Sequence, residues 1–162
     1  MKTILAAIDF SSVSSAIVAE AAALAHALGG KVVLVTVLVE PIYVKEYAPP
    51  QKSLEKITVA QERAVRDHLA AIQQRLHSEF IPAEILVRRG NAARHILKEA
   101  ERHDIAYIVI GSHGHTAFFE LVLGSTTQAV LKHARQPVVI IPPKMLKPRR
   151  TKAKAAARTA ND

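Results

Sequence analysis

Five short apolar runs rich in β-branched residues are spread along the 162-residue chain, and segments with helical periodicity separate them. Most of these runs are continuously hydrophobic, which is typical of strands that are covered on both faces. Strands that alternate with helices pair in parallel through right-handed crossovers. The sequence therefore predicts an α/β fold, an open five-stranded parallel sheet with helices on both faces, and strands at residues 3–8, 32–38, 84–87, 105–110 and 138–141.

The first two helices are expected on either side of the second strand. Ser11 and Ser12 are suitable N-caps for an alanine-rich helix that would end at Gly29-Gly30, because serine is favoured at the start of a helix and glycine just after its end. In residues 54–77, apolar residues recur at helical spacing. We expect the buried face of this second helix to consist of Ile57, Ala60, Ala64, Leu69, Ile72 and Leu76.

Two shorter helices are expected in the second half of the chain. Asn91 is a suitable N-cap for the third helix, which would direct four side chains inward, those of Ala93, Ile96, Leu97 and Ala100. The fourth helix is expected from near Ser125 to about residue 133, with three side chains available to the core, those of Ala129, Val130 and Leu131.

The net charge of +8 is concentrated at the C-terminal end of the chain. Residues 144–162 contain seven lysines and arginines and one aspartate, so residues 1–143 carry only +2. This division predicts one folded domain, residues 1–143, and a basic, flexible C-terminal tail, residues 144–162. The tail could bind nucleic acid through counterion release, or it could be a solvated segment that improves solubility.

Several classes of protein are excluded or disfavoured by composition. The chain has no cysteine, so it has neither disulfides nor a thiolate zinc site. Asp9 ends the first apolar run, which is too short for a signal peptide. No apolar run approaches the ~20 residues of a membrane-spanning helix. We therefore expect a soluble, cytoplasmic protein.

The segment GSHGHTAFFELVLGSTT, residues 111–127, carries the chain's most distinctive chemistry. The strand at 105–110 runs directly into Gly111 and Gly114, and a helix is expected to start at Gly124. Both ends would meet at the carboxyl edge of the sheet, where small residues allow backbone amides to approach a ligand and a helix N-terminus favours anions. The pattern predicts a phosphate cradle in two halves; alternatively, the glycines only cap a strand and a helix.

The same segment lacks the features of several catalytic sites. It has no phosphate-binding lysine of the GxxxxGK[ST] type, and the chain contains no GxGxxG, HExxH or GxSxG pattern. His113 and His115 have no third ligand at a convincing spacing, so we expect no dedicated metal site. Ligand binding is therefore better supported than fast nucleotide turnover, and no catalytic residue is assigned.

The spacing Gly111-xx-Gly114, nine residues, then Gly124-Ser125 resembles the nucleotide-binding motif of the universal stress protein (UspA-like) family, in its ATP-binding class. The resemblance covers roughly residues 2–142. It includes ILAAIDFS at 4–11, which resembles the family's first strand and acidic turn, and PVVIIP at 137–142, which resembles its last strand. Phe10 stands where the family often has glycine, so the turn after Asp9 is expected to be less open.

This resemblance implies a Rossmann-like sheet of order 3-2-1-4-5 and an adenine nucleotide, ATP or AMP or ADP, with Mg²⁺ accompanying the phosphates. The residues that it places near adenine and ribose are Ala7, Ile8, Asp9 and Val37. The residues that it places near ribose and phosphates are Ile110, Gly111, Ser112, His113 and Gly114, and those that would hold the phosphate chain are Gly124, Ser125, Thr126 and Thr127.

The resemblance also implies a homodimer. Its interface would contain the last strand, Val138, Val139, Ile140 and Ile141, and pairing across a two-fold axis would protect an exposed edge. The leading hypothesis is a homodimeric, ATP-binding stress-response protein that acts as a sensor or regulator. The alternatives are slow ATP hydrolysis or phosphoryl transfer in the same crevice, and a dimerisation module with a nucleic-acid-binding tail.

Overall fold

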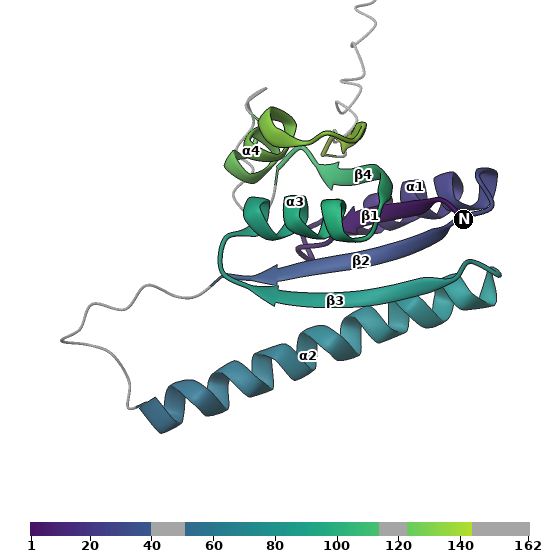
Figure 1. The fold of residues 1–162 in the computed structure, drawn as a ribbon. Helices are drawn as coiled ribbons and strands as arrows, with labels where there is room; N and C mark the ends of the chain where they lie inside the picture. The colour runs from purple at the N-terminus through teal and green to yellow at the C-terminus, as the bar shows by residue number, and fades with distance from the viewer. Residues whose placement is uncertain (40–50, 114–122, 144–162) are drawn as a thin grey trace, which may run out of the picture.

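Strands and helices alternate strictly in the computed structural model, which describes residues 1–39, 51–113 and 123–143. The elements are β1 (Thr3–Ala7), α1 (Ser14–Ala27), β2 (Lys31–Leu38), α2 (Gln51–Ser78), β3 (Ala83–Arg89), α3 (Ala92–Arg102), β4 (Ile105–Gly111), α4 (Ser125–His133) and β5 (Val138–Ile141). All five strands pair in parallel in the order β3-β2-β1-β4-β5 (Figure 1). The predicted fold class and strand order are confirmed.

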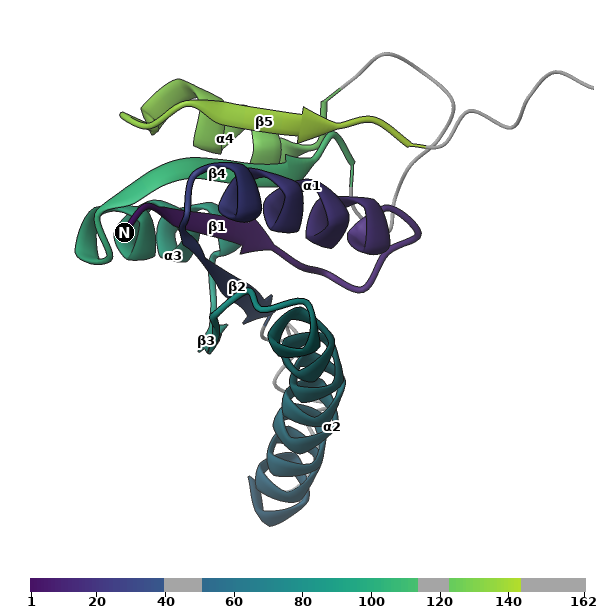
Figure 2. The same ribbon diagram turned by 90° about the vertical axis from the view of Figure 1, so that its right-hand side faces the viewer.

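Helices cover both faces of this sheet (Figure 2). Ile4 faces the layer that contains α1 and α2, whereas its neighbour Leu5 faces the layer of α3 and α4, and neither side chain is exposed. Successive residues of a strand point to opposite faces. Burial on both sides therefore explains why the strands are continuous apolar runs. Within the described residues, no helix is long and apolar enough to cross a membrane.

The start of α1 differs from the expectation that Ser11 or Ser12 caps it. The N-cap is Val13, which has no side-chain capping bond. Asp9 Oδ1 instead accepts hydrogen bonds from the Ser11 amide, at 2.9 Å, and from Ser14 Oγ, at 3.2 Å. These bonds bend the chain into a turn, so the helix begins three residues after Ser11. The helix ends as predicted, with Gly29 in the left-handed region at φ 57°.

The buried face of α2 was predicted correctly only in its C-terminal half. Leu69 and Leu76 are fully buried, whereas Ile57, Ala60 and Ala64 are exposed. The N-terminal half of α2 extends beyond the sheet (Figure 1), where a polar contact replaces the core: Arg89 Nη2 donates to the Thr58 carbonyl at 2.9 Å and lies 3.1 Å from Glu62 Oε2.

The two shorter helices follow the prediction with one exception. Asn91 caps α3, since its side chain accepts a hydrogen bond from the Arg94 amide at 2.9 Å. In α4, Val130 is fully buried and Ala129 packs against the core, but Leu131 is 40% exposed. Position 131 lies about 100° further around the helix than Val130, which turns its side chain toward solvent.

A buried carboxylate fixes α3 against β3. The Glu99 side chain is 1% exposed; its Oε1 lies 2.7 Å from Arg88 Nε and its Oε2 lies 3.2 Å from His103 Nε2. Burial opposes ionisation of Glu99, but the hydrogen bond and charge of Arg88, together with Arg102 and His103, outweigh that effect and hold the pKa of the carboxyl below its usual range. The opposite end of α3, its N-terminus, reaches the cavity described below.

We predict that Glu99→Gln lowers the free energy of unfolding by about 1–3 kcal/mol at neutral pH, because it leaves buried polar groups with weaker partners. A carboxylate whose pKa is lowered by folding stabilises the native state above its unfolded pKa and loses that contribution as pH falls through its folded pKa. The difference between the two proteins in urea unfolding should therefore shrink below about pH 4. Glu101→Gln, on the exposed face of α3, is the matched control; an equal effect there would contradict the prediction.

Candidate functional site

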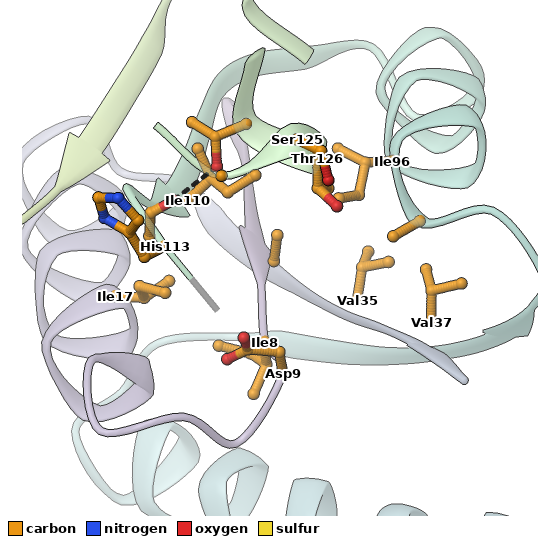
Figure 3. Close-up of a pocket in the computed structure, with 15 residues that line it drawn as sticks. Ile8, Asp9, Ile17, Val35, Val37, Ile96, Ile110, His113, Ser125 and Thr126 are labelled. Carbon is orange, nitrogen blue, oxygen red and sulfur yellow. Dashed lines mark hydrogen bonds between the residues drawn. The ribbon is translucent and has the colours of Figure 1, made fainter. Parts of the chain in front are cut away.

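A cavity of about 190 Å³ opens at the carboxyl ends of β1, β2 and β4 (Figure 3). The strand order reverses here, because β2 and β4 lie on opposite sides of β1. Open α/β sheets bind ligands at such a reversal point. The N-terminal ends of α3 and α4 also reach the cavity, through Ala92 and Ser125.

One part of the cavity is an apolar slot. Its walls come from the strand ends and from the helices packed on both faces of the sheet, and they include Ile8, Ile17, Val35, Val37, Ile96 and Ile110 (Figure 3). Ile8, Ile96 and Ile110 are almost completely buried, and Val37 is half-buried. Rigid, branched side chains on two sides suit a flat apolar or aromatic ring.

The other part of the cavity is the start of α4. The N-cap, Gly124, contributes no side-chain capping bond, and the first amides of a helix have no partner within it. Ser125 is exposed and Thr126 is half-buried, and both line the cavity. Free amides, hydroxyls and the positive end of the helix dipole together favour an anion at this position.

Two hydrogen bonds join the two halves of the glycine segment, and a third joins the segment to β5. The Gly124 amide donates to the Ser112 carbonyl at 2.8 Å, and Thr127 Oγ1 donates to the Gly111 carbonyl at 2.7 Å. The Ser112 amide in turn donates to the Ile141 carbonyl of β5 at 2.8 Å. The hydroxyl proton of Thr127 is therefore used inside the protein. Among the three predicted phosphate-binding hydroxyls, only those of Ser125 and Thr126 keep their protons for a ligand.

Two glycines of the motif, Gly111 and Gly124, line the cavity, and their conformations do not require glycine. Neither Gly111 nor Gly124 has a positive φ, so other residues could adopt these conformations. A Cβ on Gly111 would lie 2.9 Å from Val13 Cγ2 and 3.5 Å from Ile17 Cδ1. Gly111 is therefore needed for the close packing of α1 on β4. Gly114 lies outside the described residues.

Asp9 combines a structural role with a place in the cavity wall. Its Oδ1 organises the turn before α1, as described above, and its side chain is exposed at the cavity (Figure 3). Phe10, where a glycine was expected, adopts φ 61°. Its ring packs against His68 of α2 with centroids 5.5 Å apart, and it does not line the cavity. The turn after Asp9 therefore keeps a glycine-like backbone.

His113 is the one histidine among the described residues that line the cavity. Its Nδ1 lies 3.0 Å from Ser112 Oγ, and its Nε2 is buried without a hydrogen-bond partner in the described part of the structure. A buried ring nitrogen without a partner marks a place where a ligand oxygen could bind. Within residues 1–39, 51–113 and 123–143, no three His, Asp or Glu side chains are grouped as a metal site.

Among the described residues of the cavity wall, one side chain has the chemistry of a Mg²⁺ ligand. Asp9 is the single carboxylate among the described lining residues, and Mg²⁺ is usually held by one or two carboxylates together with substrate phosphates and water. A magnesium ion at this site would therefore depend mainly on phosphate oxygens brought by the ligand.

Most predicted site residues lie together around the cavity. Of those that the structure describes, all except Ser112 line it; Ser112 is buried behind it, at 6% exposure. Sequence reasoning missed four lining residues, which are Ile17, Val35, Ala92 and Ile96. A signal existed for three of them: Val35 shares a strand face with Val37, and Ala92 and Ile96 follow the N-cap Asn91 at the same edge of the sheet.

Comparison with known proteins gives the same assignment. The model of the universal stress protein family matches residues 1–142. The chain belongs to the universal stress protein family. Universal stress protein MJ0577 of Methanocaldococcus jannaschii is 29% identical over 76 residues, which are 47% of this chain and 47% of that protein, so the match spans about half of each.

Solved structures of the family share the fold. The structure of MJ0577 superimposes with a TM-score of 0.77 at 23% identity, over 88% of this chain and 96% of that one. UspA of Lactobacillus plantarum gives a TM-score of 0.75 at 24% identity, over 86% and 97%. A universal stress protein solved in complex with cAMP gives 0.61 at 18% identity, over 86% and 95%.

We predict that Thr127→Val lowers the free energy of unfolding by about 1–3 kcal/mol, because it leaves the buried Gly111 carbonyl without its donor. Thr126→Val removes a hydroxyl one residue earlier, where the side chain is half-buried and makes no hydrogen bond in the described structure, and should cost less than about 0.5 kcal/mol. Urea unfolding followed by circular dichroism measures both. Equal losses would show that the Thr127 bond does not fix α4 to β4.

Proposed function

We propose that this universal stress protein binds an adenine nucleotide in the cavity and acts as a homodimeric sensor or regulator in the stress response. One observation carries the proposal: a single cavity has both an apolar wall and a polar wall. An apolar slot lies at the ends of β1 and β2, and the uncapped start of α4 lies beside it. This combination fits a ligand with a flat heterocycle and a phosphate.

Each predicted residue has a place in this proposal. The base would lie against Ile8, Val37 and Ile110, with Asp9 accepting hydrogen bonds from ribose hydroxyls. The phosphate would bind the amides and hydroxyls of Ser125 and Thr126. A relative of this fold was solved with cAMP, which supports an adenine nucleotide as the ligand class. ATP, ADP or AMP, with Mg²⁺ on the phosphates, remains the specific proposal.

Binding is favoured over turnover by the composition of the cavity wall. The described lining residues include no lysine or arginine and one carboxylate, Asp9, whose Oδ1 already accepts two hydrogen bonds. Phosphoryl transfer depends on cationic groups that stabilise the transferring phosphate. Release of ADP in proportion to protein concentration, lost on substitution of Gly124, would instead support the alternative of slow hydrolysis.

The proposed unit is a nucleotide-binding domain of residues 1–143 with a basic tail at 144–162, and the proposed dimer pairs through β5. Support for the dimer comes from the position and exposure of this strand. It is an edge of the sheet, and its four residues, Val138–Ile141, are all half-buried. An apolar edge with free backbone groups favours pairing with another strand.

The direct test identifies the small molecule that freshly purified protein releases on denaturation, then titrates stripped protein calorimetrically with Mg·ATP, AMP and adenosine. Ser125→Asp sharpens this test. We expect it to lower affinity for AMP roughly tenfold or more by charge repulsion, while leaving adenosine binding unchanged. Stability should stay equal or rise by up to about 1 kcal/mol, since a carboxylate is favourable in the first turn of a helix.

Ser125→Asn is the matched control, because it has the same shape without the charge. If Ser125→Asp and Ser125→Asn bind AMP as the unchanged protein does, the phosphate does not lie at the start of α4. If neither AMP nor adenosine binds the unchanged protein, the cavity is not a nucleotide site.

The dimer proposal is tested at Ile140. Pro137 and Ile141 point their carbonyls toward β4, where these accept from the Ile108 and Ser112 amides, so the alternate residue Ile140 directs its amide toward the free edge. Ile140→Pro should give a monomer by light scattering, because proline removes that amide. Ile140→Ala keeps the amide and should remain dimeric; a dimeric Ile140→Pro protein would rule out pairing through this edge.

A further inference from the structure

Three helices of the chain end in a residue with left-handed backbone conformation. Gly29 follows α1 with φ 57°, Phe80 follows α2 with φ 60°, and Asp104 follows α3 with φ 49°. Glycine adopts this conformation without steric cost, and aspartate tolerates it, whereas it is unfavourable for a bulky aromatic residue. Phe80 is therefore the exception among the three.

The hydrogen bonds at the end of α2 show that glycine would fit this position. The Phe80 amide donates to the His77 carbonyl at 3.0 Å, and the Ile81 amide donates to the Leu76 carbonyl at 2.9 Å. The corresponding bonds at the end of α1 are made by Gly29 and Gly30. Both ends are Schellman motifs, in which glycine is the usual left-handed residue. The backbone alone does not explain a phenylalanine here.

The side chain of Phe80 does not explain it either. Phe80 is 95% exposed, so its ring makes almost no contact with the fold that it strains. Local strain that contacts within the fold do not offset is often found at functional sites. The exposed ring of Phe80 is therefore a candidate for contact with a partner.

An open groove lies between α1 and the C-terminal end of α2, next to the turn that contains Phe80. Its volume is about 570 Å³. Its apolar part consists of alanines of α1, Leu76 of α2 and Ile81 just after α2, and its polar part consists of Ser15, His26, Arg75 and Glu79. Glu79 and Ile81, the neighbours of Phe80 in sequence, both line it. A protruding aromatic ring and a hollow of small residues thus adjoin each other.

The rim of this groove carries one positive and one negative side chain, so it is complementary in charge to the same rim on a second copy. Arg75, in the last turn of α2, and Glu79, just after the end of α2, are four residues apart, and both are exposed. Neither has an ion-pair partner in the described part of the chain. In an interface with two-fold symmetry, a contact from residue i of one copy to residue j of the other occurs twice. Two ion pairs can therefore form, each between Arg75 of one copy and Glu79 of the other.

We propose that the groove between α1 and α2 is a self-association surface, in which Phe80 of one copy enters the groove of a second copy of this chain. Exposed aromatic rings that fill a pocket on a partner are the usual anchors of protein interfaces. The walls of the groove are α1, which packs on β1, β2 and β4, and α2, which packs on β2 and β3. The groove shares no described lining residue with the cavity at the strand ends and contains none of β5.

The experiment uses the absence of tryptophan from the chain. Phe80→Trp introduces one indole, whose accessibility to acrylamide is measured over a range of protein concentrations. We expect quenching to fall several-fold as concentration rises. Val59→Trp, on α2 at a position that is 67% exposed and about 30 Å from Phe80 along the helix, is the control and should stay accessible throughout.

A second substitution fills the groove without touching the ring. Ala23 is exposed on α1, and glutamine is well tolerated in helices. In the Phe80→Trp background, Ala23→Gln should weaken self-association roughly tenfold or more, the cost typical of losing an anchor's pocket. Arg75→Glu and Glu79→Arg should each weaken it, and the double reversal should restore it. Phe80→Gly should abolish it while raising the stability of the dilute monomer.

Three results would overturn the proposal. One is an indole that stays fully accessible at every concentration. Another is an indole that is shielded even in the dilute monomer, which would mean that a segment of the same chain covers it. The third is concentration-dependent shielding that Ala23→Gln leaves unchanged, because the ring would then bind elsewhere.

Discussion

The polar wall of the cavity depends on one buried hydrogen bond, from Thr127 Oγ1 to the Gly111 carbonyl. It fixes the first turn of α4 against the end of β4, although a long segment of chain separates them. The Gly124 amide adds a second bond to the Ser112 carbonyl. A helix N-terminus favours an anion only where its first amides point at the ligand. These two bonds therefore hold the first turn of α4 in the wall of the cavity.

The fold could be predicted in large part because its main signal is local. A strand covered on both faces needs consecutive apolar residues, and a surface helix needs a periodic apolar stripe, so both are visible in the sequence. The strand order is not local, since composition does not state which strands are neighbours. It came from the resemblance carried by the glycine spacing. The cavity then followed from the order, because the reversal point of such a sheet determines where a ligand binds.

The incorrect predictions of local structure arise where a residue contacts another part of the chain, or where its backbone amide has a different partner from the one expected. Ser11 has the chemistry of a helix cap, but its amide is bound by Asp9. Ile57 has the spacing of a core residue, but α2 is held at that level by Arg89 and not by the core. Gly111 lines the cavity, and the spacing of the glycines did not show that Val13 of α1 also excludes a side chain there.

A positive φ at phenylalanine also could not be predicted from the sequence. The two phenylalanines with this conformation differ in how far their rings are buried. Phe10 and Phe80 have almost the same φ, 61° and 60°. The ring of Phe10 packs against the core beneath α1 and α2 and meets His68, so burial offsets its strain within one chain. The ring of Phe80 is almost entirely in solvent and receives no such compensation. The neighbouring groove is lined in part by small and aliphatic side chains, on which the aromatic ring of a second copy would pack.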